Sequence, residues 1–233
     1  MPQHRHRITR VIFCVISCIA IVLTGNTQSP QFGVFAGPQM SSANYFVTES
    51  KQSTEYKYGF HAGFTMKVPF ETNLYFSPAA YYSMKGYKAS FKKYAYPPDM
   101  DAIDNDTRIH TFNLAFLLQY NMGSKPSHFF LKAGPVLDFQ LKGKETYHLM
   151  NGNTVSKNMV YSFGEYGRYG ASLFFQLGFE TRSGFFVAGQ YDLGITDINN
   201  ADLGPRINHR VFGLTFGTYF KNKKIVLDTR NKE

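Results

Sequence analysis

The residues of this chain that could carry chemistry are scattered along its length. Five histidines follow the N-terminal segment: His61, His110, His128, His148 and His209. They match no HExxH pattern and no other spacing that brings two imidazoles to one metal ion. We therefore expect each imidazole to be solvated or hydrogen-bonded within the fold. The sequence predicts no catalytic residue, no cofactor-binding residue, no metal ligand and no cofactor.

A lipid-modifying hydrolase is an alternative from a different functional class. Such an enzyme needs a nucleophile and a base within hydrogen-bond reach of each other. His110 or His209, with Ser90 or Ser162, are the candidates for that pair. No sequence spacing supports the pairing. If the protein is such a hydrolase, replacement of His110 or of His209 should abolish its lipid turnover.

The segment from Asp99 to Asp106 is acidic and could offer oxygen ligands to calcium. It lacks both the glycine and the terminal glutamate that an EF-hand loop requires. We expect a solvated loop here, with a weak surface cation site as the alternative. The glycine-rich segment 164–170 leads into a predicted strand and not into a helix N-terminus, so it is not a phosphate-binding loop.

The N-terminus has the organisation of a secretory signal peptide, which we predict over residues 1–27. Residues 1–10 contain three arginines and no acid, residues 11–23 are almost wholly apolar, and small polar residues follow. A helix over 11–23 is about 20 Å long, which is short for a permanent membrane anchor. Lipidation of Cys18 is a further alternative, although the residues after it remain apolar. Both cysteines of the chain, Cys14 and Cys18, lie in this segment.

The composition favours strands and excludes several classes of protein. The mean hydropathy of −0.27 is too low for a helical membrane protein, while the 23 phenylalanines and 16 tyrosines favour β-structure. A length of 233 residues suits one β domain. The formal charge of +9 comes from scattered residues without a long basic run, so we expect no nucleic-acid partner.

A period of two, typical of barrel strands, runs through most of the chain. In residues 60–68 the even positions are apolar, while the odd positions are His, Gly, Thr and Lys. Eight such segments occur, near 31–40, 57–69, 72–88, 107–122, 127–142, 166–182, 184–196 and 207–221. The same alternation places five charged residues on the inner face: Lys67, Lys132, Asp138, Glu180 and Asp192. We also expect tyrosines near strand ends to form interfacial girdles, namely Tyr75, Tyr81, Tyr87, Tyr120, Tyr169 and Tyr219.

The connections alternate in length, which is expected when short turns face the periplasm and long loops face outward. The long polar segments are 41–56, 89–106, 143–165 and 197–206. The short ones are 69–72, 122–127 and 182–184. The sequence therefore predicts an all-β fold, an eight-stranded antiparallel up-and-down transmembrane β-barrel over residues 28–221, followed by a polar C-terminal tail over 222–233. A barrel of this size is filled by its own side chains, which argues against a diffusion pore.

Several motifs resemble a known family. They are residues 33–38 (GVFAGP), 133–135 (AGP), 191–200 (YDLGITDINN) and 208–214 (NHRVFGL). Together they resemble the outer-membrane β-barrel domain family of Bacteroidetes, often called PorT-like or porin-family. One class in that family is a component of a gliding-linked protein secretion system. The chain departs from many such barrels because its last strand ends at Phe220 and a polar tail follows.

These features together predict a non-enzymatic protein of the cell outer membrane, with a structural or binding role carried by its extracellular loops. The expected partners are the lipid bilayer and a protein or surface ligand at those loops. The alternatives are a component of an envelope protein-secretion system, the hydrolase described above, and a soluble ligand-carrying barrel. The last would need an apolar interior and a polar exterior.

Overall fold

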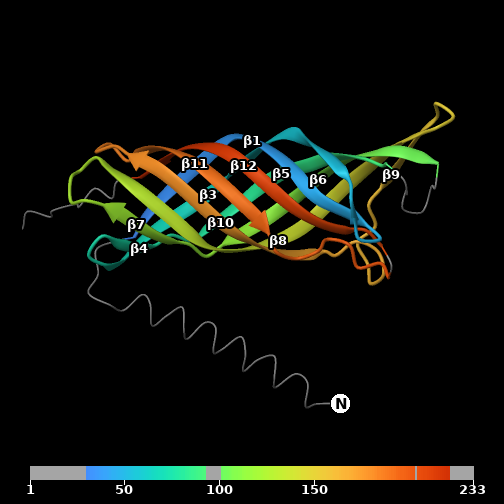
Figure 1. The fold of residues 1–233 in the computed structure, drawn as a ribbon. Helices are drawn as coiled ribbons and strands as arrows, with labels where there is room; N and C mark the ends of the chain where they lie inside the picture. The colour runs from blue at the N-terminus through green and yellow to red at the C-terminus, as the bar shows by residue number, and fades with distance from the viewer. Residues whose placement is uncertain (1–29, 93–100, 203, 221–233) are drawn as a thin grey trace, which may run out of the picture.

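The computed structural model describes residues 30–92, 101–202 and 204–220, and these residues form β-strands and connections (Figure 1). The predicted signal peptide, 1–27, and the predicted tail, 222–233, lie outside the described residues. No helix in the described part is long and apolar enough to cross a membrane. The strands are β1 (Gln31–Val47), β2 (Ser50–Lys51), β3 (Ser53–Glu71), β4 (Leu74–Phe76), β5 (Ala79–Ser90), β6 (Ala102–Ala115), β7 (Leu118–Met122), β8 (His128–Leu149), β9 (Thr154–Asn158), β10 (Tyr169–Glu180), β11 (Phe185–Gly194) and β12 (Arg206–Tyr219).

The strands close into an antiparallel ring, as the alternation predicts. The order is β1-β12-β11-β10-β8-β6-β5-β3, and the ring closes because β1 also pairs with β3. β4 and β5 share one position in the ring, because β4 also pairs with β3. β6 and β7 share the next position, because β7 pairs with β4 on one side and with β8 on the other. The wall therefore has eight strand positions. β4 and β5 are separated at Pro78, whose ring nitrogen has no hydrogen to donate to the ladder.

Two of the predicted long loops are largely strand, which corrects the sequence interpretation. In segment 41–56, β1 runs on to Val47 and β3 begins at Ser53, with a turn at Thr48 and Glu49 between them. In segment 143–165, β8 continues to Leu149 and β9 folds back onto it. Beyond the apolar zone the outer face of these stretches is mostly polar, as at Lys144 and Thr146, and the inner face is mixed, since Tyr45 and Tyr147 are buried there beside polar residues. The contrast between two faces that marks a strand in the sequence is therefore weak in these stretches.

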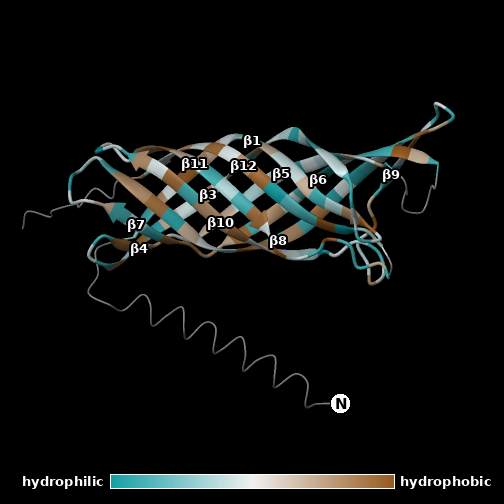
Figure 2. Ribbon diagram, viewed as in Figure 1, coloured by the Kyte–Doolittle hydropathy of each residue, from teal (hydrophilic) through white to brown (hydrophobic). Residues whose placement is uncertain are grey.

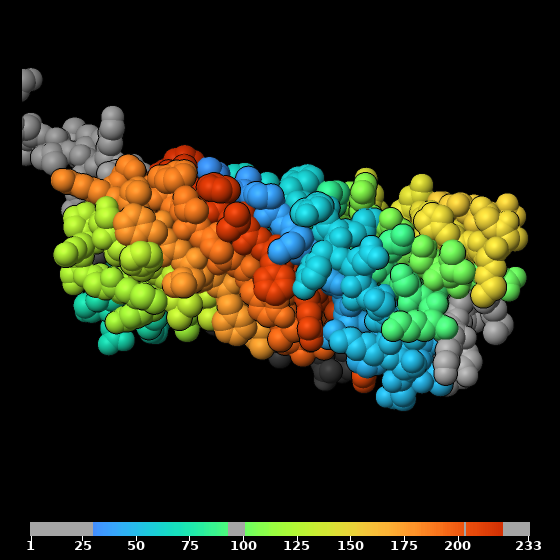
Figure 3. Space-filling model, turned by 45° about the horizontal axis from the view of Figure 1, so that its top comes forward, coloured from blue at the N-terminus to red at the C-terminus, as the bar shows by residue number. Residues whose placement is uncertain are grey.

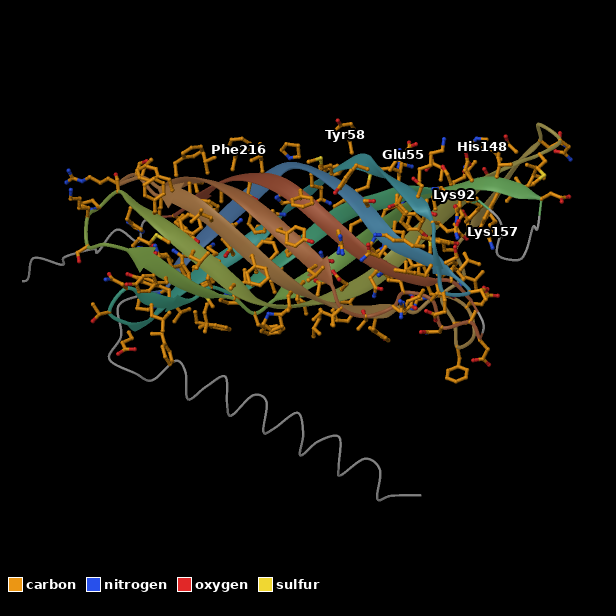
Figure 4. All side chains as sticks on the ribbon, in the orientation of Figure 1. Glu55, Tyr58, Lys92, His148, Lys157 and Phe216 are labelled. Carbon is orange, nitrogen blue, oxygen red and sulfur yellow. The ribbon has the colours of Figure 1, made fainter. Side chains whose placement is uncertain are left out.

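Hydrophobic and hydrophilic residues alternate along the strands in the middle of the barrel (Figure 2). Most of the large apolar side chains there are exposed on the outer surface, whereas the interior contains many buried polar and charged side chains. Large exposed apolar side chains point outward from seven of the eight strand positions, the exception being that of β4 and β5; they include Phe32, Phe60, Phe64, Phe112, Leu131, Leu137, Leu173, Phe175, Leu177, Val187, Leu214 and Phe216. We call the zone that these side chains form the apolar belt. Phe216 and Tyr58 project away from the wall in Figure 4. An apolar exterior around a polar interior is the reverse of a soluble carrier, so that alternative is wrong.

The two ends of the barrel differ as predicted. Tight turns join β3 to β4, β7 to β8 and β10 to β11, and both β1 and β12 have their terminal residues at this end. Gly184 forms one of these turns with φ +92°, and a Cβ there would lie 2.8 Å from the Tyr219 carbonyl oxygen. At the other end the strands run on into the longer connections and β9 (Figure 1).

The predicted tyrosine girdles are only partly present. Tyr120 and Tyr169 are exposed on the outer face, but Tyr81, Tyr87 and Tyr219 are buried inside the barrel. A tyrosine's position along its strand determines how far it lies from the membrane centre. Whether its side chain points to lipid or into the barrel depends on the alternation of successive residues along the strand.

A charge placed in the apolar belt should destabilise the folded barrel in a membrane. Phe175 lies at the middle of β10 with its ring outward, so we expect Phe175→Arg to lower the free energy of unfolding by about 2–4 kcal/mol. Ser156→Arg, on the exposed strand β9, is the control and should change it by about 0.5 kcal/mol or less. Urea titration of protein refolded into phospholipid vesicles measures both. Equal stability of the two variants would contradict the assignment of the belt to lipid.

Candidate functional site

The interior of the barrel contains all five charged residues that the sequence places there. Lys67, Lys132, Asp138, Glu180 and Asp192 are each buried. Near the short-turn end, Lys67 Nζ lies 2.7 Å from Glu180 Oε2, and Lys132 Nζ donates to the Tyr219 hydroxyl at 3.0 Å. A buried charge needs such partners because it has lost its water.

A sixth inner charge, Lys85 on β5, is missing from the sequence prediction. Its Nζ lies 2.9 Å from Asp138 Oδ1 and 3.6 Å from Asp192 Oδ2, so one ammonium bridges the carboxylates of β8 and β11. The alternation along the strand could have identified it, because Lys85 lies two and four residues after Ser83 and Tyr81, which also point inward.

Between these charged groups the interior is filled by neutral polar side chains. His61 is fully buried, with Nδ1 3.1 Å from Gln39 Oε1 and Nε2 3.1 Å from Thr215 Oγ1. Gln190 Oε1 accepts a hydrogen bond from the same threonine at 2.6 Å. Beside this layer lies a cavity of about 20 Å³, which is room for about one water molecule. The described side chains thus fill the barrel at mid-height.

The outer mouth is closed by a hydrophobic cluster that sequence reasoning did not anticipate. Strand residues Tyr45, Tyr87 and Ile109 pack there against Tyr166 and Ile198 from the two connections that flank β10 and β11. Those connections also pair with each other: the Gly167 amide donates to the Ile198 carbonyl at 2.8 Å, and the Asn200 amide donates to the Glu165 carbonyl at 2.7 Å. The β9–β10 and β11–β12 connections are therefore folded into the mouth.

Glu145 fixes this arrangement from the wall. Its buried carboxylate accepts hydrogen bonds from Tyr166 Oη at 2.6 Å, from Tyr147 Oη at 3.0 Å and from Asn105 Nδ2 at 3.0 Å. Burial raises the pKa of the Tyr166 hydroxyl above its usual value, and burial likewise raises the pKa of Tyr161 to about 12. Both phenols therefore keep their protons at neutral pH, and Tyr166 can act as a donor. The loop over 159–168 is tethered through this contact.

The tethered loop and the β8–β9 hairpin end in exposed apolar side chains. Phe163 is 100% exposed and Met150 is 75% exposed, and Val155 and Val160 are exposed as well. The segment around residues 150–165, yellow in Figure 3, forms one end of the molecule. Figure 4 shows the polar residues Glu55, Lys92 and His148 toward the same end, together with Lys157 of this segment. We call residues 150–165 the outer tip.

The structure does not bring the five histidines together. His61 and His209 are buried inside the barrel, whereas His110 lies on the outer surface beside Tyr82. His148 bonds Asp104 on the outer surface, and His128 lies near Glu180 at the opposite end. No hydrogen bond of the described residues joins His110 or His209 to Ser90 or Ser162. The hydrolase hypothesis therefore has no histidine–serine pair in this arrangement.

The acidic segment is not a loop where the structure describes it. Asp104 and Asp106 lie in β6, Asp104 Oδ2 is 3.3 Å from Lys88 Nζ, and Asp106 pairs with Lys57. The described residues contain no group of three or more His, Cys, Asp or Glu placed to hold a metal ion. These carboxylates thus form ion pairs on the wall.

Removal of the Lys85 ammonium should be costly, because Asp138 and Asp192 would remain buried without a cation. We expect Lys85→Met to lower the free energy of unfolding by about 3–5 kcal/mol. Lys88→Met on the same strand removes a partly exposed pair and should cost about 1 kcal/mol or less. The Lys85→Met, Asp138→Asn, Asp192→Asn variant should recover part of the loss. The urea concentration at the midpoint of unfolding, measured in detergent, compares the stabilities of the three variants. An unchanged midpoint for Lys85→Met would refute the role of this ion pair.

No curated protein matches the sequence. Ail of Yersinia pestis, solved with the heparin analogue sucrose octasulfate, is 13% identical with a TM-score of 0.44, over 83% of this chain and 100% of that chain. Neisserial surface protein A gives the same identity, TM-score and coverage. The translocator domain of the autotransporter NalP from Neisseria meningitidis is 10% identical with a TM-score of 0.34, over 91% of this chain and 96% of that chain.

The family assignment comes from the sequence profile described as outer membrane protein beta-barrel domain, which matches residues 26–200. The matched region contains β1 to β11, and the apolar belt around them is the surface that a lipid bilayer covers. This chain therefore belongs to the outer membrane protein beta-barrel domain family and resides in the outer membrane.

Proposed function

We propose that this protein is a non-enzymatic, non-conducting barrel that binds a macromolecular partner at the cell surface through its outer tip. The observation that carries this proposal is the fully exposed Phe163 on a loop tethered by the Tyr166–Glu145 hydrogen bond. Exposed apolar residues on a soluble surface mark interaction sites. A phenyl ring presented by an ordered loop is an economical anchor because little conformational entropy is lost when it binds.

The filled interior supports the non-conducting part of the proposal. Solute would have to displace the layer of His61, Gln39 and Thr215 as well as the cluster in the outer mouth. We therefore expect liposomes containing the protein to show no swelling in an isosmotic pentose solution. Liposomes containing a general diffusion porin are the positive control. Swelling at a rate comparable to that control would show that the interior opens in a membrane.

The outer tip can be tested by site-specific photo-crosslinking in living cells. A photo-reactive phenylalanine analogue at Phe163 should give a defined adduct, and excess purified protein added to the cells should compete for it. The same analogue at Ser124, in the β7–β8 turn at the opposite end, is the control and should give no such adduct. The absence of an adduct from position 163, with the variant present at the surface, would refute binding at the tip.

A role in an envelope protein-secretion system is the second proposal, and only the PorT-like sequence motifs support it. Such a component would contact large envelope partners and should co-purify with them from solubilised membranes. The crosslinking experiment distinguishes the two proposals in part. Adducts from Ser124 or Arg182 at the short-turn end, without any from Phe163, would favour the secretion role.

A further inference from the structure

A basic cleft lies on the outer surface of the wall, just beyond the apolar belt. It has a volume of about 740 Å³ and lies over β6, β8 and β9. Its lining includes four Lys or Arg residues but a single acid, Asp106; the cations are Lys57, Arg108, Lys142 and Lys144. His110 and His148 also line it. The cleft borders the outer tip and shares Asn158, Met159 and Tyr161 with it, but its cations lie outside the tip. The inference concerns these cations and therefore goes beyond the proposed function.

The cations in this cleft face one another across the β6–β8 ladder. Arg108 is directly opposite Lys144, and His110 is directly opposite Lys142. Side chains at such positions have their Cβ atoms about 4.5–5.5 Å apart, and like charges there are destabilising. Among the residues that the structure describes, no ion pair includes Arg108, Lys142 or Lys144. The cleft therefore has cationic groups that an external anion could neutralise.

The nearby carboxylates are already engaged. Asp106 pairs with Lys57. The Lys57 side chain passes over β5 at Gly86, where a Cβ atom on the glycine would lie 3.3 Å from Lys57 Cδ. Asp104 is shared by Lys88 and His148. The excess positive charge thus remains on Arg108, Lys142 and Lys144.

A β-bulge adds Lys142 to this surface. The β6–β8 register shifts between His110 and Thr111, whose partners are Lys142 and Gln140, so that Leu141 is an extra residue. As a result Leu141 and Lys142 are both exposed in succession, while Gln140 and Gly143 are buried. Strict alternation from Gln140 would have turned Lys142 inward. Bulges commonly re-aim a side chain at a functional position.

The height of the cleft matches the lipid headgroup layer. Phe112 and Phe139 pack together on the outer face at 6.4 Å, and they mark the edge of the belt below the cleft. Strands rise about 3.3 Å per residue and tilt by about 40° in such barrels. His110 and Arg108 are therefore about 5 and 10 Å above Phe112. The headgroup layer extends roughly 5–8 Å beyond the hydrocarbon on each side. The cleft therefore begins within this layer, at His110 and its neighbour Lys142, and Arg108 lies about 2 Å above the layer.

We propose that this cleft binds the phosphate groups of a phosphorylated lipid in the outer leaflet. Arg108 can bind two phosphate oxygens at once through its planar guanidinium, and Lys144 and Lys142 add point charges on either side. The acyl chains of the same lipid would lie against Leu141 and Phe112, which continue the belt directly below. This continuity with the apolar surface favours a lipid over a soluble phosphate.

The test uses purified protein in neutral detergent, titrated with bisphosphorylated lipid A and followed by native mass spectrometry. Arg108→Gln/Lys144→Gln should bind this lipid at least about tenfold more weakly than the unchanged protein, since two charge-assisted contacts are lost. Lys51→Gln/Lys92→Gln removes the same charge from the same end of the barrel, outside the cleft, and should bind within about twofold of the unchanged protein. A mobility shift on boiling confirms that each variant is folded.

Two further probes identify the source of the phosphate. Dephosphorylated lipid A should bind no better to the unchanged protein than to Arg108→Gln/Lys144→Gln. A soluble sugar bisphosphate should bind at least about tenfold more weakly than the lipid, because it lacks the apolar contact. Equal binding of the soluble sugar bisphosphate would overturn the lipid assignment. If Lys51→Gln/Lys92→Gln lost as much lipid binding as Arg108→Gln/Lys144→Gln, the assignment of the lipid to the cleft would be overturned. The attraction of the lipid would then depend on the overall charge of the protein.

Discussion

The closure of the ring by β1 is the constraint on which the rest of the structure depends. β1 pairs with β12 on one side and with β3 on the other, so the ring of eight strand positions is closed over the residues that the structure describes. In a bilayer an unpaired backbone group costs several kcal/mol, and only closed barrels or helices avoid that cost. Closure also fixes which face of every strand meets lipid. The inner face of an eight-position ring then encloses a space that side chains must fill.

A narrow interior of this kind leaves little room for water, so charged side chains inside it need protein partners. The barrel places Lys67, Lys85 and Lys132 inside, and each lies beside an acid or a phenol that originates from another strand. Such contacts tie distant parts of the wall together, since Lys67 and Glu180 are 113 residues apart in sequence. They also occupy the space through which a solute would pass. The features available for recognition are consequently the two ends and the outer surface of the wall.

The sequence predicted the ring well because lipid and lumen impose opposite polarities on successive residues. The eight strand positions and five of the inner charges were evident from the alternation, and the short turns from the lengths of the connections, whereas Lys85 and Glu145 were missed. The outer third was not, because both faces of 41–47 and 143–149 are polar or mixed once the wall leaves the belt, and the segments resemble loops. Lys142 shows a second limit. Its outward direction depends on the extra residue at Leu141, and a bulge has no signature in the alternation.

The part of the chain that was hardest to predict is also the part suited to interaction. Residues in the belt must satisfy lipid, and residues in the lumen must satisfy one another, so neither group is free to be selected for a partner. Beyond the belt, outward side chains such as Arg108 and Lys144 are exposed, and no ion pair of the described residues includes them. The extension of β6 and β8 holds them on a paired sheet, which positions charges more rigidly than a loop would. A barrel with a filled interior thus acquires binding surfaces by lengthening its strands, without any change to the ring that anchors it.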